Sequence, residues 1–99
     1  MTPEEQSRLV QSVRDVSGEH RYVLPLGGAT AFIDYQRAGG VVSMLHAEVP
    51  PQYQGRGIGA AMVRGALLLV RKSGEKVLPR CSFVVAFMRR HAEFHDLLS

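Results

Sequence analysis

The stretch from Gln54 to Ala60, QGRGIGA, combines three glycines with one arginine and leads directly into a helix-like pattern. Glycine has no Cβ, so a ligand can approach its backbone N–H group closely. The first N–H groups of a helix have no partner within the helix, and together with the helix dipole they bind phosphate oxygens. Gln54 and Arg56 add hydrogen bonds and positive charge at the rim. The stretch therefore predicts a phosphate-binding loop, and the alternative is a glycine-rich turn that only lets a helix pack tightly on a sheet.

Two familiar phosphate-binding patterns fit this loop poorly. Neither Gly-Lys-Ser nor Gly-Lys-Thr occurs, so the P-loop pattern is absent. Gly55-x-Gly57-x-x-Ala60 formally matches the dinucleotide fingerprint, but it does not follow the expected strand end at Val49 in a tight turn. The acid about 20 residues further on, Glu75, precedes the next strand instead of ending it. A dinucleotide-binding domain is therefore disfavoured.

The first half of the chain predicts one helix and four strands. Thr2 is a good N-cap, Pro3 suits the first helical position, and acids follow, so we expect a helix over residues 3–11. Runs rich in β-branched and aromatic residues are separated by glycine turns, which predicts strands over residues 13–16, 21–24, 30–35 and 41–49. Strands joined by tight turns pair antiparallel. Alternation along the fourth strand predicts one face formed by Val42, Met44, His46 and Glu48.

The second half predicts a parallel strand–helix–strand unit. Helical periodicity over residues 57–73 has an apolar stripe, and Gly74 is a natural stop. The members of that stripe are Met62, Val63, Ala66, Leu67 and Val70. A strand over residues 80–85 and a last helix or pair of turns over 87–98 follow. The order αββββαβα predicts an α/β fold with a mixed sheet, a parallel crossover at its end and helices covering its faces.

Composition bounds the class of protein. Ninety-nine residues make one domain, 1–99, and a 45% apolar share fits a folded protein. No apolar run reaches the roughly 20 residues of a membrane span, and the N-terminus lacks the order of a signal peptide. One cysteine excludes an internal disulfide, so we expect a cytoplasmic protein. The net charge is +3 with arginines concentrated late, which suits an anionic ligand or a solvated surface. No aromatic stacking platform accompanies the charge, so nucleic-acid binding is disfavoured.

Gln54-Gly55-Arg56-Gly57-Ile58-Gly59 resembles the Q/R-x-x-G-x-G/A pyrophosphate loop of the GNAT acetyltransferase superfamily. With HAEVP over 46–50 and PRCSF over 79–83, the chain from about Arg21 resembles one branch, the very small stand-alone N-acetyltransferase-domain proteins. The resemblance implies a minimal GNAT-like fold and acetyl-CoA as cosubstrate. It implies that the backbone of Glu48 and Val49 bonds the pantetheine arm. It also implies that the pyrophosphate binds the amides of Gly55, Arg56, Gly57, Ile58, Gly59 and Ala60.

Acetyl transfer to an amine needs a deprotonated amine, an oxyanion stabiliser and a proton for the leaving thiolate. GNAT enzymes often supply that proton from a tyrosine near the start of the last helix, but Val85 to Arg90 contains none. Cys81, on the expected last strand, can replace it as proton donor or act as a nucleophile, and the alternative is a small core residue. His46 or Glu48 can accept a proton from the ammonium substrate, and the alternatives are a structural histidine and a solvated acid.

His91 and His95 share a helix face, but HAEFH is not the H-E-x-x-H zinc pattern and no third ligand is evident. We therefore expect surface histidines and no metal. The sequence as a whole predicts an acetyl-CoA-binding N-acetyltransferase that modifies a protein lysine or a small amine. The alternative is an acyl-CoA-binding module with little or no catalytic activity. The acceptor itself is not specified by any motif.

Overall fold

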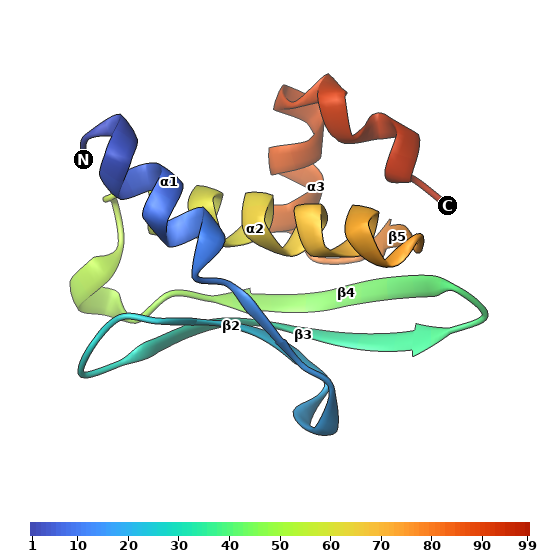
Figure 1. Ribbon diagram of the computed structural model, residues 1–99, viewed down its shortest axis with the longest axis horizontal. Coiled ribbons are helices and arrows are strands. Elements are labelled where there is room, and N and C mark those ends of the chain that lie inside the picture. Colours follow the sequence, from blue (N-terminus) through green and yellow to red (C-terminus); the bar gives the residue numbers. More distant parts are fainter.

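The strands of the computed structural model, which describes residues 1–99, form one sheet in the order of the sequence (Figure 1). The first four pair antiparallel, and β4 pairs with β5 in parallel. Their bounds are β1 (Arg14–Val16), β2 (Arg21–Pro25), β3 (Thr30–Ala38), β4 (Val41–Glu48) and β5 (Lys76–Pro79). This mixed sheet confirms the predicted fold class.

Three α-helices and three short 3-10 turns complete the chain in the predicted order. They are α1 (Pro3–Gln11), η1 (Ser17–Glu19), η2 (Pro51–Tyr53), α2 (Ile58–Ser73), α3 (Ser82–Arg90) and η3 (Ala92–Leu97). Thr2 and Glu5 form a capping box at the start of α1, and Gly74 caps the end of α2 with φ 76°. Both signals were readable from the residue types, because each satisfies backbone groups that a helix end leaves open.

The core lies between the sheet and α2. All five residues of the predicted apolar stripe are fully buried there. They pack on inward-facing strand residues such as Tyr22, Ile33 and Met44. Helix α1 packs closely against α2 at Gly65, where a Cβ would lie 2.5 Å from the Val10 carbonyl oxygen. Helix α2 is therefore the element that holds the rest of the chain together.

All the helices lie on one face of the sheet, whereas the sequence predicted helices on its faces generally (Figure 1). Short connections join the consecutive strands β1, β2, β3 and β4, so α2 is the only helix that crosses between two strands of the sheet. Helices α1 and α3 pack beside α2. The other face, called the open face below, carries Arg21, Asp34 and His46 in one cross-strand row. No α-helix lies against this face (Figure 1).

The predicted last strand over 80–85 is wrong, because β5 ends earlier, at Pro79. The N–H groups of Arg80 and Cys81 both donate to the Met44 carbonyl, at 2.9 and 3.1 Å, and the chain then turns into α3. The spacing of Val84, Phe87 and Met88, all buried, is that of a helix face. The last predicted helix accordingly starts at Ser82 and is followed by η3.

The predicted face of β4 is also wrong beyond Met44. Asp34 pairs with His46, but the next residue of β3, Tyr35, pairs with Met44, so Leu45 is an extra residue in β4. Such a β-bulge reverses which face the following side chains occupy. Val42 and Met44 are buried beneath the helices, whereas His46 and Glu48 point to the open face.

A charged network closes the end of the sheet remote from the 54–60 loop. Arg37 donates to Glu75 at 2.7 Å, to Asp15 at 2.9 Å and to the Tyr35 hydroxyl at 2.9 Å. Partial burial tends to raise the pKa of the Glu75 carboxyl, but hydrogen bonds from Arg37 and Ser73 outweigh it and hold the pKa below its usual value. The network links β1, β3 and the start of β5.

Candidate functional site

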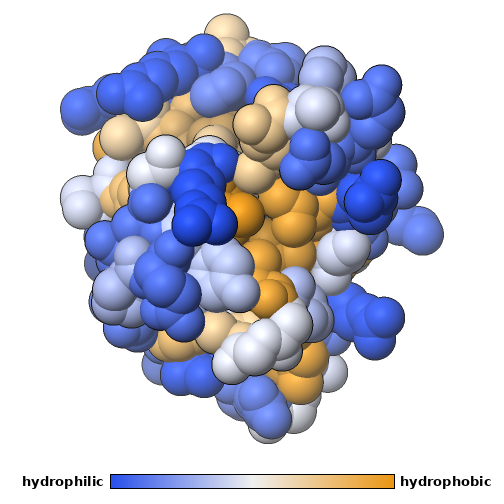
Figure 2. All heavy atoms as spheres, turned by 90° about the vertical axis from the view of Figure 1, so that its left-hand side faces the viewer, coloured by the Kyte–Doolittle hydropathy of each residue, from blue (hydrophilic) through white to orange (hydrophobic).

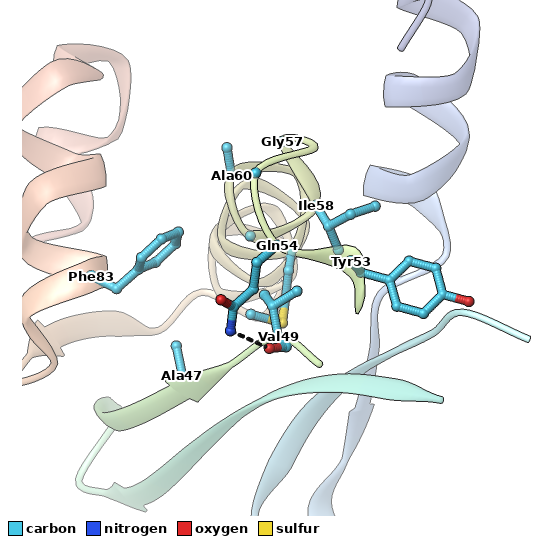
Figure 3. A pocket seen from close by; sticks show the side chains of 11 residues that line it. Ala47, Val49, Tyr53, Gln54, Gly57, Ile58, Ala60 and Phe83 are labelled. Carbon is cyan, nitrogen blue, oxygen red and sulfur yellow. Dashed lines mark hydrogen bonds between the residues drawn. The ribbon is translucent and has the colours of Figure 1, made fainter. Parts of the chain in front are cut away.

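The loop between β4 and α2 is held by two side-chain hydrogen bonds. The Tyr53 hydroxyl donates to the Leu26 carbonyl at 2.9 Å, which ties η2 to the β2–β3 turn. The Gln54 Nε2 donates to the Val49 carbonyl at 3.0 Å, which closes the loop on itself (Figure 3). Gln54 therefore shapes the loop with its amide nitrogen and leaves its carbonyl oxygen free to accept.

Helix α2 begins without a side-chain cap. Gly57 is its N-cap residue, with φ 78°, a conformation that glycine adopts without strain. No side chain accepts from the first turn, and no acid lies in that turn. The N–H groups of Ile58, Gly59 and Ala60 consequently have no partner within the helix. Free N–H groups at the positive end of a helix dipole are typical of anion-binding sites.

Gly59 also makes room for a neighbouring side chain. A Cβ built on Gly59 would lie 2.5 Å from Cζ of Phe83. The bare backbone thus leaves space for the Phe83 ring between α2 and α3. Phe83 is 45% exposed, so one side of its ring remains available.

A cavity of about 480 Å³ lies where β4 and β5 part. Strand pairing ends at Met44 and Pro79, and beyond that point Ala47 and Phe83 face each other across the gap (Figure 3). The lining consists of Ala47, Val49, Tyr53, Gln54, Gly55, Gly57, Ile58, Gly59, Ala60, Met62 and Phe83. At this end of the molecule, apolar side chains are exposed in a hollow that hydrophilic residues surround (Figure 2). An apolar groove that ends at unpaired amides suits a ligand with an uncharged arm and an anionic head.

A family model described as GCN5-related N-acetyl-transferase matches residues 21–97. The chain belongs to this family. The match confirms the resemblance that the loop and its flanking segments indicated. No curated protein matches the chain significantly. No helix has the length and apolar character needed to cross a membrane.

Most of the residues predicted to bind acetyl-CoA lie around the cavity. All of them but Glu48 and Arg56 line this space. The side chain of Glu48 points to the open face, which leaves its backbone as the part near the gap. Arg56 lines a neighbouring cavity of about 710 Å³ beside α1, and its guanidinium lies 5.7 Å from the Tyr53 ring centre.

The three predicted catalytic residues do not line the cavity. Cys81 is the N-cap residue of α3 and is half-buried, not a strand residue as predicted. Its N–H bonds to Met44 at the point where the strands part. His46 and Glu48 lie together on the open face, 3.5 Å apart between Nε2 and Oε2, with side chains each 59% exposed. The structure therefore does not bring the three residues together into one site.

The two histidines near the C-terminus have structural partners. His91 Nδ1 lies 2.7 Å from the Phe87 carbonyl oxygen, and the ring stacks on Phe87 with centroids 3.9 Å apart. His95 Nε2 lies 2.6 Å from the Met88 carbonyl oxygen. Each thus satisfies a carbonyl in the last turn of α3. No group of three metal-ligating side chains is present.

Sequence reasoning missed four lining residues. The sequence placed Ala47 in a strand, Met62 in the apolar stripe of a helix and Tyr53 in a loop, without assigning any of them to a binding site. Phe83 was hidden by the wrong strand assignment. A signal for Phe83 did exist, because the i, i+3, i+4 spacing of Val84, Phe87 and Met88 with two arginines behind them is typical of a helix. Nothing local to the sequence indicates the bulge that aims Ala47 at the cavity.

Proposed function

We propose that this chain binds acetyl-CoA between α2 and α3 and transfers the acetyl group to a primary amine. The observation that carries the proposal is the uncapped start of α2 beside an apolar cavity at the parting of β4 and β5. Family membership supports the acetyltransferase activity. The geometry supports the place where the cosubstrate binds.

The pyrophosphate would bind the amides at the loop and first turn of α2, from Gly55 to Ala60. The pantetheine arm would run along the free edge of β4, where its amides pair with the backbone of Glu48 and Val49. The Val49 carbonyl already accepts from Gln54, so the arm would share or replace that bond. The apolar walls would exclude water from the thioester.

In the transfer, the amine nitrogen attacks the thioester carbonyl carbon, the new C–N bond forms and the C–S bond breaks. The amine must lose a proton, and the departing thiolate must gain one. In this proposal His46 or Glu48, which lie together on the open face, takes the proton from the amine, directly or through water. Cys81, the N-cap residue of α3 next to the parting of the strands, is the candidate to protonate the leaving thiolate.

The second candidate function is an acyl-CoA-binding module. It is favoured by one specific observation, because α3 carries Phe83 and Phe87 but no tyrosine. The three tyrosines of the chain lie on β2, β3 and η2. A module of this kind would bind acetyl-CoA equally well and show no turnover.

One experiment separates the two functions. Thermal unfolding is measured with and without acetyl-CoA, and free thiol release is followed with a panel of amines and lysine peptides. Stabilisation with amine-dependent thiol release supports the enzyme. Stabilisation without release supports the binding module. Absence of stabilisation at millimolar acetyl-CoA refutes both.

A further inference from the structure

The cavity of about 710 Å³ beside α1, called the α1 cleft below, is separate from the cavity in which acetyl-CoA is proposed to bind. Tyr53, Gly55 and Ile58 line both spaces and so form the wall between them. The Tyr53 ring and the Ile58 side chain point toward α1 and away from Phe83 (Figure 3). The volume of the α1 cleft is typical of sites that bind small molecules.

One wall of the α1 cleft lies outside the part of the chain that the family model matches. Glu5, Arg8 and Leu9 of α1 form this wall, whereas the match covers residues 21–97. Close packing of α1 against α2 at Gly65 fixes the position of the wall. The α1 cleft is therefore built in part by a segment that the family match does not include.

The floor of the α1 cleft is apolar. Leu9, Leu26 and Tyr53 are partly buried and pack against the core, and Ile58 is buried. The Tyr53 hydroxyl already donates to the Leu26 carbonyl at 2.9 Å, so Tyr53 offers a ligand the apolar surface of its ring. This floor suits a ligand with an apolar body.

Two arginines at the α1 cleft have no acidic partner. Arg8 lies in the last turn of α1, and the Arg56 guanidinium lies 5.7 Å from the Tyr53 ring centre. The arginines that form ion pairs are elsewhere in the chain, and they are Arg21, Arg37, Arg64 and Arg71. The one acid of the lining, Glu5, accepts from the Thr2 N–H at 3.2 Å in the capping box and pairs with neither arginine. The α1 cleft thus combines two unpaired guanidinium groups with an apolar floor.

We propose that the α1 cleft binds a small organic anion that has an apolar body and one carboxylate or phosphate group. The guanidinium group presents N–H donors in a fork that matches two oxygens of a carboxylate or phosphate. Arg8 from α1 and Arg56 from the loop provide the positive charge, and the apolar body lies on Leu9, Leu26 and Tyr53. This anion binds in addition to acetyl-CoA, on the other side of the wall that the two cavities share.

Titrations with naphthoate and with naphthyl phosphate, followed by the amide NMR shifts of the protein, test the proposal. The shifts should concentrate around Arg8, Tyr53 and Arg56, and the tighter of the two probes identifies the anionic group. Naphthalenemethanol, which has the same body without the charge, should bind at least tenfold more weakly.

Charge-removing variants test the role of the two arginines. Arg8→Ala and Arg56→Ala should each weaken naphthoate binding at least fivefold. Alanine is a good helix former, so Arg8→Ala should stay folded, which its amide spectrum verifies. Arg89→Ala is the matched control, because Arg89 is an exposed arginine in the last turn of a helix, forms no ion pair and does not line the α1 cleft. It should leave the affinity within twofold.

A repeat of the naphthoate titration with saturating CoA separates this inference from the proposed function. Binding weakened less than tenfold by CoA supports a separate site, whereas complete displacement by CoA overturns it. Equal affinity in Arg8→Ala and Arg89→Ala, or equal affinity for naphthoate and naphthalenemethanol, overturns the anion site. Absence of CoA-induced stabilisation in the wild-type protein refutes the proposed function instead, and the naphthoate series on the free protein still decides the α1 cleft.

Discussion

Gly57→Glu tests the anion site at the start of α2 most directly. The new Cβ meets only Gln6 Oε1, at 3.9 Å, so the side chain has room. The backbone at φ 78° costs a non-glycine residue about 1–2 kcal/mol. For a domain of this size, 1 kcal/mol corresponds to roughly 4–8 °C in Tm. The free variant should therefore remain folded with a moderately lower Tm.

Gly74→Glu is the matched control at the opposite end of the same helix. Gly74 has φ 76° and nothing within 4 Å of a built Cβ, so the backbone cost is the same. A glutamate at a helix C-terminus adds about 0.3–1 kcal/mol of repulsion, whereas one at the N-terminus is favourable. Gly74→Glu should thus be the less stable of the two in the absence of ligand.

The response to ligand should be the reverse. CoA at a hundred times its Kd stabilises the folded state by about 2.7 kcal/mol, which corresponds to a Tm increase of about 10 °C or more. Gly57→Glu places bulk and negative charge at the pyrophosphate site and should lose most of that increase. Gly74→Glu should keep it, and Gly57→Ala should keep part of it. A full ligand-induced shift in Gly57→Glu would show that the loop is not the site.

Three further predictions follow from other parts of the structure. Cys81→Ala should lower turnover at least tenfold, about 1.4 kcal/mol in transition-state stabilisation, with CoA affinity nearly unchanged, and normal turnover per folded molecule would assign the thiol to packing. In denaturant titrations, Gly65→Ala should destabilise the protein by about 1–3 kcal/mol or more, because the added methyl would lie 2.5 Å from the backbone of α1. Gly59→Ala should cost less than about 1 kcal/mol, because its methyl meets only the edge of the Phe83 ring. Stability should fall as pH drops below 4.5 through the lowered pKa of Glu75, since a carboxylate with a depressed folded pKa stabilises only above it, and Glu75→Gln should flatten that pH dependence.

The sequence predicted the parts of the fold that depend on local patterns. The stripe of α2, the cap at Thr2 and the stop at Gly74 follow from side-chain spacing and backbone preference within one helix. The strand order followed from tight turns, which leave antiparallel neighbours little freedom. The position of the glycine loop was predictable because its glycines directly precede a helical pattern. Most of the predicted cosubstrate residues accordingly line one cavity.

The wrong predictions, the face of β4 and the extent of the last strand, concern features that depend on pairing between two strands. The bulge at Leu45 is a mismatch between β3 and β4, and neither strand shows it alone. The end of β5 depends on Met44, whose carbonyl accepts from both Arg80 and Cys81 and stops further pairing. The residues after Pro79 have high strand propensity, which predicted a strand over residues 80–85. Local preference was overridden by tertiary hydrogen bonding, as is common for short apolar runs.

The bulge also explains how neighbouring residues of β4 come to face opposite sides of the sheet. Without the extra residue at Leu45, alternation would aim His46 at the helices and Ala47 at solvent. With it, small Ala47 faces the cavity, where a large or charged side chain would fill the gap opposite Phe83. His46 and Glu48 face the other way and lie on the open face. One inserted residue thus places small Ala47 in the wall of the proposed cosubstrate cavity and the titratable pair His46 and Glu48 on the open face.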